Sequence, residues 1–192
     1  MIPLKKIVIV GPESTGKSTL CELLGKHYQT MWVPEFAREY LLANGNTYTY
    51  DDLLTIAKGQ LAQEDEISLE LIVQSRGSNI EQRQLTARSS QLLFIDTDMY
   101  VMKVWCEFVF GNCHQWILDQ INSRKYDLYL LCNTDLPWVK DELREYPDLE
   151  TREKLFHIYK DILINQITPW VEIKGNHEER LRVAIDTVNK IM

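Results

Sequence analysis

Apolar residues along the chain fall into short runs that alternate with longer segments of helical period. Runs of β-branched and aliphatic residues occupy positions 6–10, 31–33, 92–95, 126–132 and 170–173. Continuous apolar strands separated by amphipathic helices are typical of a parallel sheet that is covered on both faces. We therefore predict an α/β fold of three αβα layers around a five-stranded parallel sheet.

The same periodicity predicts the helices. They are expected at residues 17–28, 36–43, 51–74, 101–110, 114–122 and 178–192, where apolar residues recur every three or four positions. Residues 75–90 are polar and form an insertion whose structure the pattern leaves open. At 192 residues, with no internal repeat or linker, the chain is expected to form a single domain over residues 1–192.

Composition narrows the choice of partners and location. The formal net charge of −7 leaves no excess of basic residues to neutralise a nucleic-acid backbone, so we expect no nucleic-acid partner. No apolar run approaches the ~20 residues that span a bilayer, and the first residues show no signal-peptide pattern. We expect a cytoplasmic protein without a membrane partner.

The four cysteines form no CxxC pair, and we interpret them as buried apolar residues in a reducing compartment. Cys106, Cys113 and His114 are the alternative candidates for a metal site. Their spacing matches no familiar zinc pattern, so the apolar interpretation is favoured.

A phosphate-binding loop follows the first predicted strand. The sequence Gly11-x-x-x-x-Gly16-Lys17-Ser18 has the P-loop pattern, with a strand directly before it and a helix directly after it. The glycines let successive backbone N–H groups point at phosphates, and the helix N-terminus adds partial positive charge. Lys17 is expected to bridge the outer phosphates of ATP, and Ser18 to ligate Mg²⁺. The predicted nucleotide-binding residues are Gly11, Glu13, Ser14, Thr15, Gly16, Lys17, Ser18 and Thr19.

Two aspartates follow the 92–95 strand, at the end of the sheet where open α/β folds bind ligands. Asp96 is predicted to be the metal-side acid that orients magnesium; the alternative is that one of the two aspartates caps the next helix. Asp98, two residues further on, is placed to face the acceptor instead.

The segment 34–40, after the second strand, is predicted to lie on the acceptor side of the site. Glu35 is expected to bind a ribose hydroxyl or act as a general base, and Arg38 to position a phosphate or hold Glu35. The alternative makes Glu35 a helix cap and Arg38 a surface residue. Gln60 and Glu64, one helical turn apart, are within reach of the same cleft, although surface packing is the favoured interpretation.

Residues 133–152 are predicted to form a lid that closes over the nucleotide and excludes water. Two prolines and a high density of charge suit a loop that opens and closes. Arg144 and Arg152 are placed to neutralise charge on the transferring phosphoryl group. The alternative for both is a solvated ion-pair network with Asp141, Glu145 and Glu150.

Other classes of P-loop protein are less compatible with the chain. The guanine-reading element Asn-Lys-x-Asp is missing, since the nearest match, Asn133-Thr134-Asp135, lacks the lysine. The ring-forming ATPases need an additional helical domain for which the chain is too short. A small-molecule kinase remains as the best-supported class.

With these segments in place, the chain resembles the ribosylnicotinamide kinase domain of the bacterial NadR-type NAD-salvage proteins. The resemblance covers nearly the whole chain and rests on motifs at residues 11–18, 35–40, 56–60, 94–98 and 137–144, in this order. It implies transfer of the γ-phosphate of ATP to the 5′-hydroxyl of nicotinamide riboside. The resemblance implies that Lys17, Ser18 and Asp96 organise MgATP, that Glu35, Arg38 and Asp98 face the riboside, and that Trp138 and Arg144 lie in the lid.

Lys17, Asp96, Arg144 and Glu35 are thus the expected catalytic residues. The multifunctional relatives also carry an adenylyltransferase domain with a His-x-x-His motif, which has no counterpart in this sequence. Two other functions stay open: a kinase for another nucleoside or small alcohol, and a non-catalytic ATP-dependent sensor.

Overall fold

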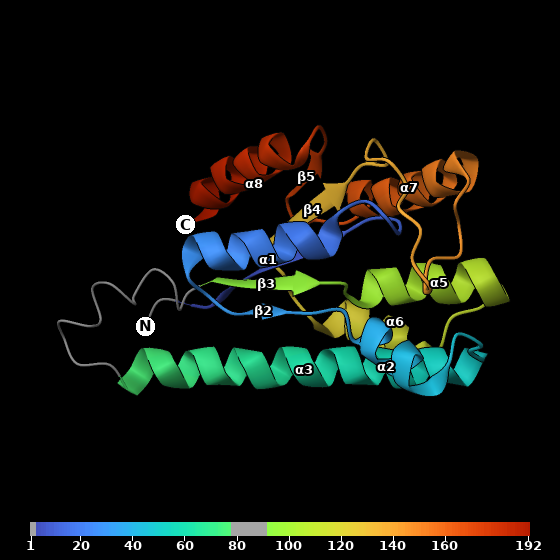
Figure 1. The fold of residues 1–192 in the computed structure, drawn as a ribbon. Helices are drawn as coiled ribbons and strands as arrows, with labels where there is room; N and C mark the ends of the chain where they lie inside the picture. The colour runs from blue at the N-terminus through green and yellow to red at the C-terminus, as the bar shows by residue number, and fades with distance from the viewer. Residues whose placement is uncertain (1–2, 78–91) are drawn as a thin grey trace.

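The computed structural model of the protein describes residues 3–77 and 92–192. Strands and helices alternate along the chain, as Figure 1 shows. Their bounds are β1 (Lys5–Val10), α1 (Lys17–Tyr28), β2 (Trp32–Val33), α2 (Phe36–Asn44), α3 (Tyr50–Gly77), β3 (Leu92–Asp96), α5 (Met99–Phe110), α6 (Gln115–Ser123), β4 (Leu128–Cys132), α7 (Leu149–Ile164), β5 (Trp170–Ile173) and α8 (His177–Ile191). The predicted insertion at 75–90 lies outside the described residues, except for 75–77 at the end of α3.

Within the described residues, the strands form one sheet of five in the order β2-β3-β1-β4-β5, and every neighbouring pair is parallel. β1 lies in the centre, where Ile7 is in register with Phe94 of β3 on one side and with Leu128 of β4 on the other. The predicted five-stranded parallel sheet is therefore confirmed. The carboxyl ends of β1, β3 and β4 all reach the same edge, which is where the P-loop begins.

Helices cover both faces of the sheet because the side chains of its central strand alternate between them. Ile7 and Ile9 pack in a core with α1 and α8, and Val8 and Val10 pack in a second core with α3, α5 and α7. α1 and α3 accordingly lie on opposite sides of β2 and β3 (Figure 1). The predicted three αβα layers are confirmed. No described helix is long and apolar enough to cross a membrane.

One helix, α7, differs from the sequence-based expectation. Residues 149–152, which were assigned to the lid, form its first turn, and the remainder of α7 was not predicted. Asp148 caps the helix, because its carboxylate accepts a hydrogen bond from the backbone N–H of Thr151 at 2.7 Å. Leu155, Tyr159 and Leu163 recur at four-residue spacing and are buried. The connection that crosses the site is therefore 133–148.

Candidate functional site

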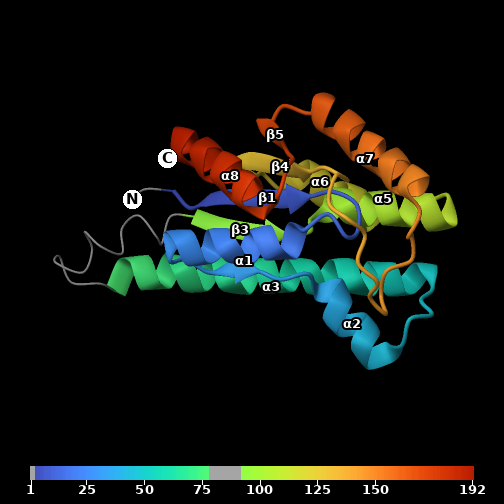
Figure 2. The same ribbon diagram turned by 45° about the horizontal axis from the view of Figure 1, so that its top comes forward.

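A cavity of about 260 Å³ opens at the carboxyl end of the sheet. Every residue from 11 to 19 lines one side of it, and the far side is lined by α5, α7, the start of α2 and residues 141–146. The connection between β4 and α7 passes the P-loop and then approaches α2, as Figure 2 shows from a second direction. It bonds to Asn46 and Tyr48, which lie between α2 and α3. The predicted P-loop and predicted lid therefore share one cavity.

The P-loop backbone depends on its two glycines. Gly16 has a φ of 78°, a left-handed conformation, and α1 starts directly after it. A Cβ atom at Gly11, whose φ is 140°, would lie 2.7 Å from the carbonyl oxygen of Cys132 in β4. Thr15 closes the loop internally, since its hydroxyl donates to the carbonyl of Pro12 at 2.7 Å. A loop of this shape presents backbone N–H groups and a helix N-terminus to a phosphate.

Asp96 lies at the end of β3, next to Lys17 and Ser18 of the P-loop, and its side chain is almost completely buried. Neither of its carboxylate oxygens accepts a hydrogen bond from the described residues. Its pKa is raised to about 7, chiefly because burial disfavours the charged form and also because of the charge of Glu35; Lys17 and the nearby hydroxyl of Ser18 act in the opposite direction. A buried carboxylate without a partner fits a divalent cation, which prefers oxygen ligands.

Two neighbours complete this chemistry. The Nζ atom of Lys17 donates to the carbonyl of Pro12 at 2.9 Å, so the ammonium is held against the loop. Ser18, which also lines the cavity, offers a hydroxyl oxygen. Ser18 and Asp96 are the residues that would hold a magnesium ion, whose remaining ligands would be water and phosphate oxygens. A neutral hydroxyl and a carboxylate that lie close together are oxygen donors of the kind such an ion prefers.

Glu35 also lines the cavity and lies between β2 and α2. It is the residue that precedes α2, but its side chain makes no capping hydrogen bond. The carboxylate is close enough to Asp96 to raise the pKa of that residue. The structure thus brings together the P-loop, Lys17, Asp96 and Glu35, as the sequence analysis expected.

The lid is attached to the P-loop through Glu13. The carboxylate of Glu13 accepts hydrogen bonds from the backbone N–H groups of Glu145 at 2.9 Å and Tyr146 at 2.6 Å, and from Nε1 of Trp138 at 3.5 Å. Beside it, the hydroxyl of Ser14 accepts from the backbone N–H of Val139 at 3.0 Å. The side chains of Glu13 and Ser14 therefore bind the lid, although both were predicted as nucleotide contacts.

Arg38 is a second point of attachment. Its Nη1 and Nη2 atoms donate to the two carboxylate oxygens of Asp141 at 3.2 and 3.1 Å. This pairing raises the pKa of Arg38 and lowers that of Asp141. Arg144, also in the lid, lines the cavity and donates from Nη1 to the carbonyl of Val139. Arg38 thus holds Asp141 of the lid. One of the roles expected for it was to hold Glu35 instead.

The far wall of the cavity is aromatic and acidic. Nε1 of Trp105 donates to the hydroxyl of Tyr48 at 2.8 Å, and that hydroxyl donates to Glu145 at 2.9 Å. The rings of Tyr48 and Trp105 meet edge to face, with centroids 4.9 Å apart. Burial raises the pKa of Glu145. The sequence analysis missed this wall; further aromatic members are Phe108, Tyr146 and Tyr159.

Asp98 does not belong to the cavity. It is the N-cap residue of α5, where one carboxylate oxygen accepts from the backbone N–H groups of Tyr100 at 3.0 Å and Val101 at 3.3 Å. The other oxygen accepts from the hydroxyl of Tyr129 at 2.9 Å. Burial raises the pKa of Asp98 to about 7. Because α5 begins at Met99 rather than at residue 101, Asp98 caps that helix and does not face an acceptor.

Arg152 has an unusual environment in the first turn of α7. Its side chain is buried, with 4% of the residue exposed. Its Nε and Nη1 atoms have no hydrogen-bond partner among the described residues, so the solvated ion-pair alternative does not describe it. It lies three residues before Leu155 and seven before Tyr159, both of which line the cavity. This spacing puts Arg152 on the cavity-facing side of the helix.

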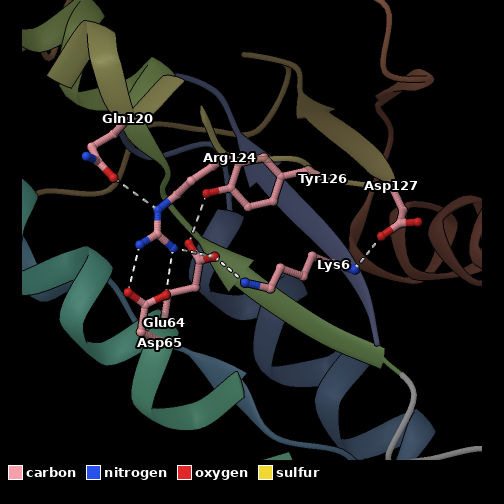
Figure 3. Close-up of polar contacts among 7 residues, drawn as sticks. All are labelled: Lys6, Glu64, Asp65, Gln120, Arg124, Tyr126 and Asp127. Atoms are coloured by element: carbon pink, nitrogen blue, oxygen red, sulfur yellow. Dashed lines mark hydrogen bonds and ion pairs between the residues drawn. The ribbon is translucent and has the colours of Figure 1, made fainter. Parts of the chain in front are cut away.

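Gln60 and Glu64 of α3 are both buried, which contradicts the favoured interpretation of surface packing. Gln60 contacts the backbone around Glu35 and Asp96. Glu64 instead accepts from Nζ of Lys6 at 2.7 Å, Nη1 of Arg124 at 3.3 Å and the hydroxyl of Tyr126 at 2.9 Å, in the separate ionic cluster drawn in Figure 3. Gln60 therefore belongs to the site, and Glu64, one helical turn further along α3, belongs to the ionic cluster.

Arg180 of α8 was not predicted. Its guanidinium is buried and donates to the carbonyls of Gly175 at 2.7 Å, Thr15 at 2.8 Å and Asn133 at 3.0 Å, and it also pairs with Asp135. Arg180 thereby joins the P-loop to the ends of β4 and β5. The sequence signal for Arg180 is its position on the apolar face of the helix, four and eight residues before the buried Ala184 and Val188.

Comparison with known proteins agrees with this arrangement. Residues 6–180 match the family described as AAA domain. The chain is 24% identical, over 98% of its length, to the trifunctional NAD biosynthesis/regulator protein NadR of Salmonella typhimurium, of which it covers 43%. The resemblance to NadR-type proteins that the motifs indicated is confirmed. The chain spans less than half the length of this curated relative.

Two solved structures share the fold. A crystal structure of NadR protein in complex with NR superposes with a TM-score of 0.66 at 21% identity, covering 98% of this chain and 49% of that one. A thymidylate kinase from Ehrlichia chaffeensis gives a TM-score of 0.59 at 14% identity, covering 99% and 100%. The predicted three-layer α/β fold with a P-loop is confirmed.

Proposed function

The chain belongs to the AAA domain family, and from this premise we propose that it is a kinase that transfers the γ-phosphate of ATP, with Mg²⁺, to the 5′-hydroxyl of nicotinamide riboside. The product would be nicotinamide mononucleotide. Support comes from the P-loop, from the neighbouring acids Glu35 and Asp96, and from the likeness to NadR, a trifunctional NAD biosynthesis/regulator protein. The proposal concerns this chain alone, which covers 43% of that relative.

On the donor side, the backbone of residues 11–19 holds the phosphates of ATP, and Lys17 neutralises the outer ones. Ser18 and Asp96 would hold the magnesium ion, which would supply neutralisation of phosphate charge when bound. The pKa of Asp96 is raised to about 7 because the acid is buried and lies near Glu35. A cation at this position favours the ionised carboxylate.

The observation that carries the choice of acceptor is the wall formed by Tyr48, Trp105 and Glu145. Nicotinamide riboside carries a permanent positive charge on its aromatic pyridinium ring. Aromatic faces attract such a cation through their quadrupole, and the carboxylate of Glu145 beside them adds direct attraction. A nucleoside with a neutral base gains neither of these two attractions. The wall therefore favours a cationic ring over a neutral one, in addition to selecting by shape.

In the transfer step, the 5′-oxygen of the riboside attacks the γ-phosphorus while the bond from that phosphorus to the β–γ bridging oxygen breaks. ADP leaves with the electron pair of that bond, and the hydroxyl proton passes to Glu35 as general base. Lys17 and Arg144 stabilise the charge on the transferring group. Arg152, buried and with two nitrogens that have no hydrogen-bond partner among the described residues, is a third cation available for this role.

The test is a panel of acceptors with MgATP, followed by acceptor-dependent formation of ADP. Nicotinamide riboside should give the highest kcat/KM, ahead of adenosine, cytidine, uridine and thymidine. The reduced riboside, in which the ring is neutral but nearly the same size, is the matched control. It should be poorer by about 10-fold or more, because a desolvated cation–π contact contributes about 2 kcal/mol.

Two results would redirect the proposal. Equal kcat/KM for the oxidised and reduced ribosides would remove charge recognition, and a higher value for another nucleoside would change the acceptor. Tight ATP binding with no acceptor-dependent ADP release would favour the sensor instead.

A further inference from the structure

The motif at residues 56–60, Ile-Ala-Lys-Gly-Gln, has no role in the function proposed above. It lies in α3, where Ile56 and Ala57 are completely buried in the core beneath α2 and α5. The two residues that follow on the same helix, Gly59 and Gln60, contact the turn that carries Glu35. The motif therefore connects the hydrophobic core to one of the two acids of the site.

Gln60 makes three hydrogen bonds to the backbone of the site, and only 1% of the residue is exposed. Its Oε1 accepts from the N–H of Phe36 at 2.8 Å, and its Nε2 donates to the carbonyl of Pro34 at 3.2 Å. Pro34 and Phe36 are the residues on either side of Glu35. The same Nε2 donates to the carbonyl of Asp96 at 3.2 Å. One amide thus touches the backbone that carries both acids.

Gly59 fixes the same turn by leaving room for it. A Cβ atom at this position would lie 2.2 Å from Cε1 of Phe36, so the ring occupies the space that any side chain would need. Phe36 is the first residue of α2 and directly follows Glu35. The turn is therefore held by a ring packed on Gly59 and by an amide bonded to its backbone.

We propose that Gln60 is a positioning residue, which sets the separation of Glu35 and Asp96 and so the place of the acceptor hydroxyl relative to the metal. The role rests on the proposed kinase function. An amide is the required group because it combines an acceptor with two N–H donors, which a carboxylate or an apolar side chain does not. Burial keeps water from replacing the lost bonds.

The experiment compares Gln60→Met with Gln63→Met on the same helix. Methionine keeps the length of glutamine and removes its hydrogen bonds. The amide oxygen of Gln63 is buried with no partner among the described residues, so its replacement matches the change in polarity but not in bonding. We expect Gln60→Met to lower kcat about 100-fold, since misplacing a reacting group by about 1 Å has this effect. Its KM for ATP should stay within about 2-fold, and Gln63→Met should be near wild type.

A double-mutant cycle with Glu35→Gln separates positioning from a general structural role. If Gln60 acts through Glu35, Gln60→Met should cost less than about 3-fold once Glu35 has been replaced, because coupled residues are not additive. The same loss in both backgrounds, or a wild-type kcat in Gln60→Met, overturns the inference.

A second measurement does not depend on the substrate or on activity. Amide hydrogen exchange at Phe36 should speed up about 10-fold or more in Gln60→Met and stay unchanged in Gln63→Met, because the bond to Gln60 protects that amide. Gln60→Glu serves if the methionine variant does not fold, since it keeps the bond to Phe36 and loses both donors; slow exchange with low kcat is then expected. Unchanged exchange in Gln60→Met rejects the positioning role even if no acceptor is phosphorylated. If the wild type has no kinase activity but exchange is faster in Gln60→Met, only the kinase function is rejected.

Discussion

The donor side and the lid side of the cavity are held in different ways. The P-loop joins β1 to α1 and is tied to the ends of β4 and β5 by the buried guanidinium of Arg180. The lid, residues 133–148, is attached to the remainder of the site by side chains such as Glu13 and Arg38, and Arg38 is half exposed. Buried bonds without competing water are costly to break, and exposed ones are not. The donor site is therefore fixed by the fold. The acceptor side is held by contacts that can break and let the lid open.

The largest expected effect is on the fixed side. Lys17→Ala should lower kcat/KM about 10³-fold, because Lys17 stabilises charge that develops during transfer. The fold should be unchanged, since the ammonium makes a single hydrogen bond to the described part of the chain, at the carbonyl of Pro12. Steady-state kinetics with circular dichroism measure both. Lys26→Ala, on the exposed face of the same helix, is the matched control, and near-normal turnover of Lys17→Ala would remove the lysine from the reaction.

Arg180→Met should break the bracing of the donor side. We expect it to lower the free energy of unfolding by about 3 kcal/mol, because several buried carbonyls and Asp135 lose a charged partner together. Arg182→Met, two residues away and exposed, is the control. Urea unfolding of the two variants tests this, and equal stability would mean that the sheet alone holds the P-loop.

Glu13→Ala should act on the lid side and not on the donor side. Removing the carboxylate leaves the N–H groups of Glu145 and Tyr146 without their acceptor, so the acceptor wall loses its anchor. We expect the KM for the acceptor to rise about 10-fold, and the Kd for an inert ATP analogue to change by less than about 2-fold. Calorimetry and kinetics give the two values. Equal losses in both would mean that Glu13 serves the nucleotide, as its place in the P-loop first indicated.

The smallest expected effect is that of Arg38→Met. Its bidentate pair with Asp141 is partly exposed, and such pairs contribute about 0.2–1 kcal/mol. The KM for the acceptor should rise about 2-fold, and adding Asp141→Asn should change it little further, because the pair is already broken. Additive losses in this cycle would indicate that Arg38 binds the acceptor directly.

The sequence predicted the elements whose determinants are local. The run at residues 6–10, the two P-loop glycines and Asp96 at a strand end define the donor side within short segments. α7 was missed because the charged residues around 141–153 suggested a loop, although Leu155, Tyr159 and Leu163 have helical spacing. Asp98 was misassigned because its role depends on the exact start of α5.

The acceptor wall was beyond such reasoning for a different reason. The wall combines three distant segments of the chain. Trp105 is 57 residues from Tyr48 in the sequence, and Glu145 is 97 residues from Tyr48. No periodicity along the chain reports a contact of this kind. Arg180 and Thr15, 165 residues apart, are a second example.

The strand order has a consequence for how the protein is made. Ile7 of β1 pairs first with Phe94 and then with Leu128, so the central strand has no partner in the sheet until β3 has left the ribosome. Contacts between residues so distant in sequence form slowly, and an unpaired Ile-Val-Ile-Val segment is prone to aggregate while it waits. Newly synthesised β1 is therefore exposed to aggregation until β3 has been made.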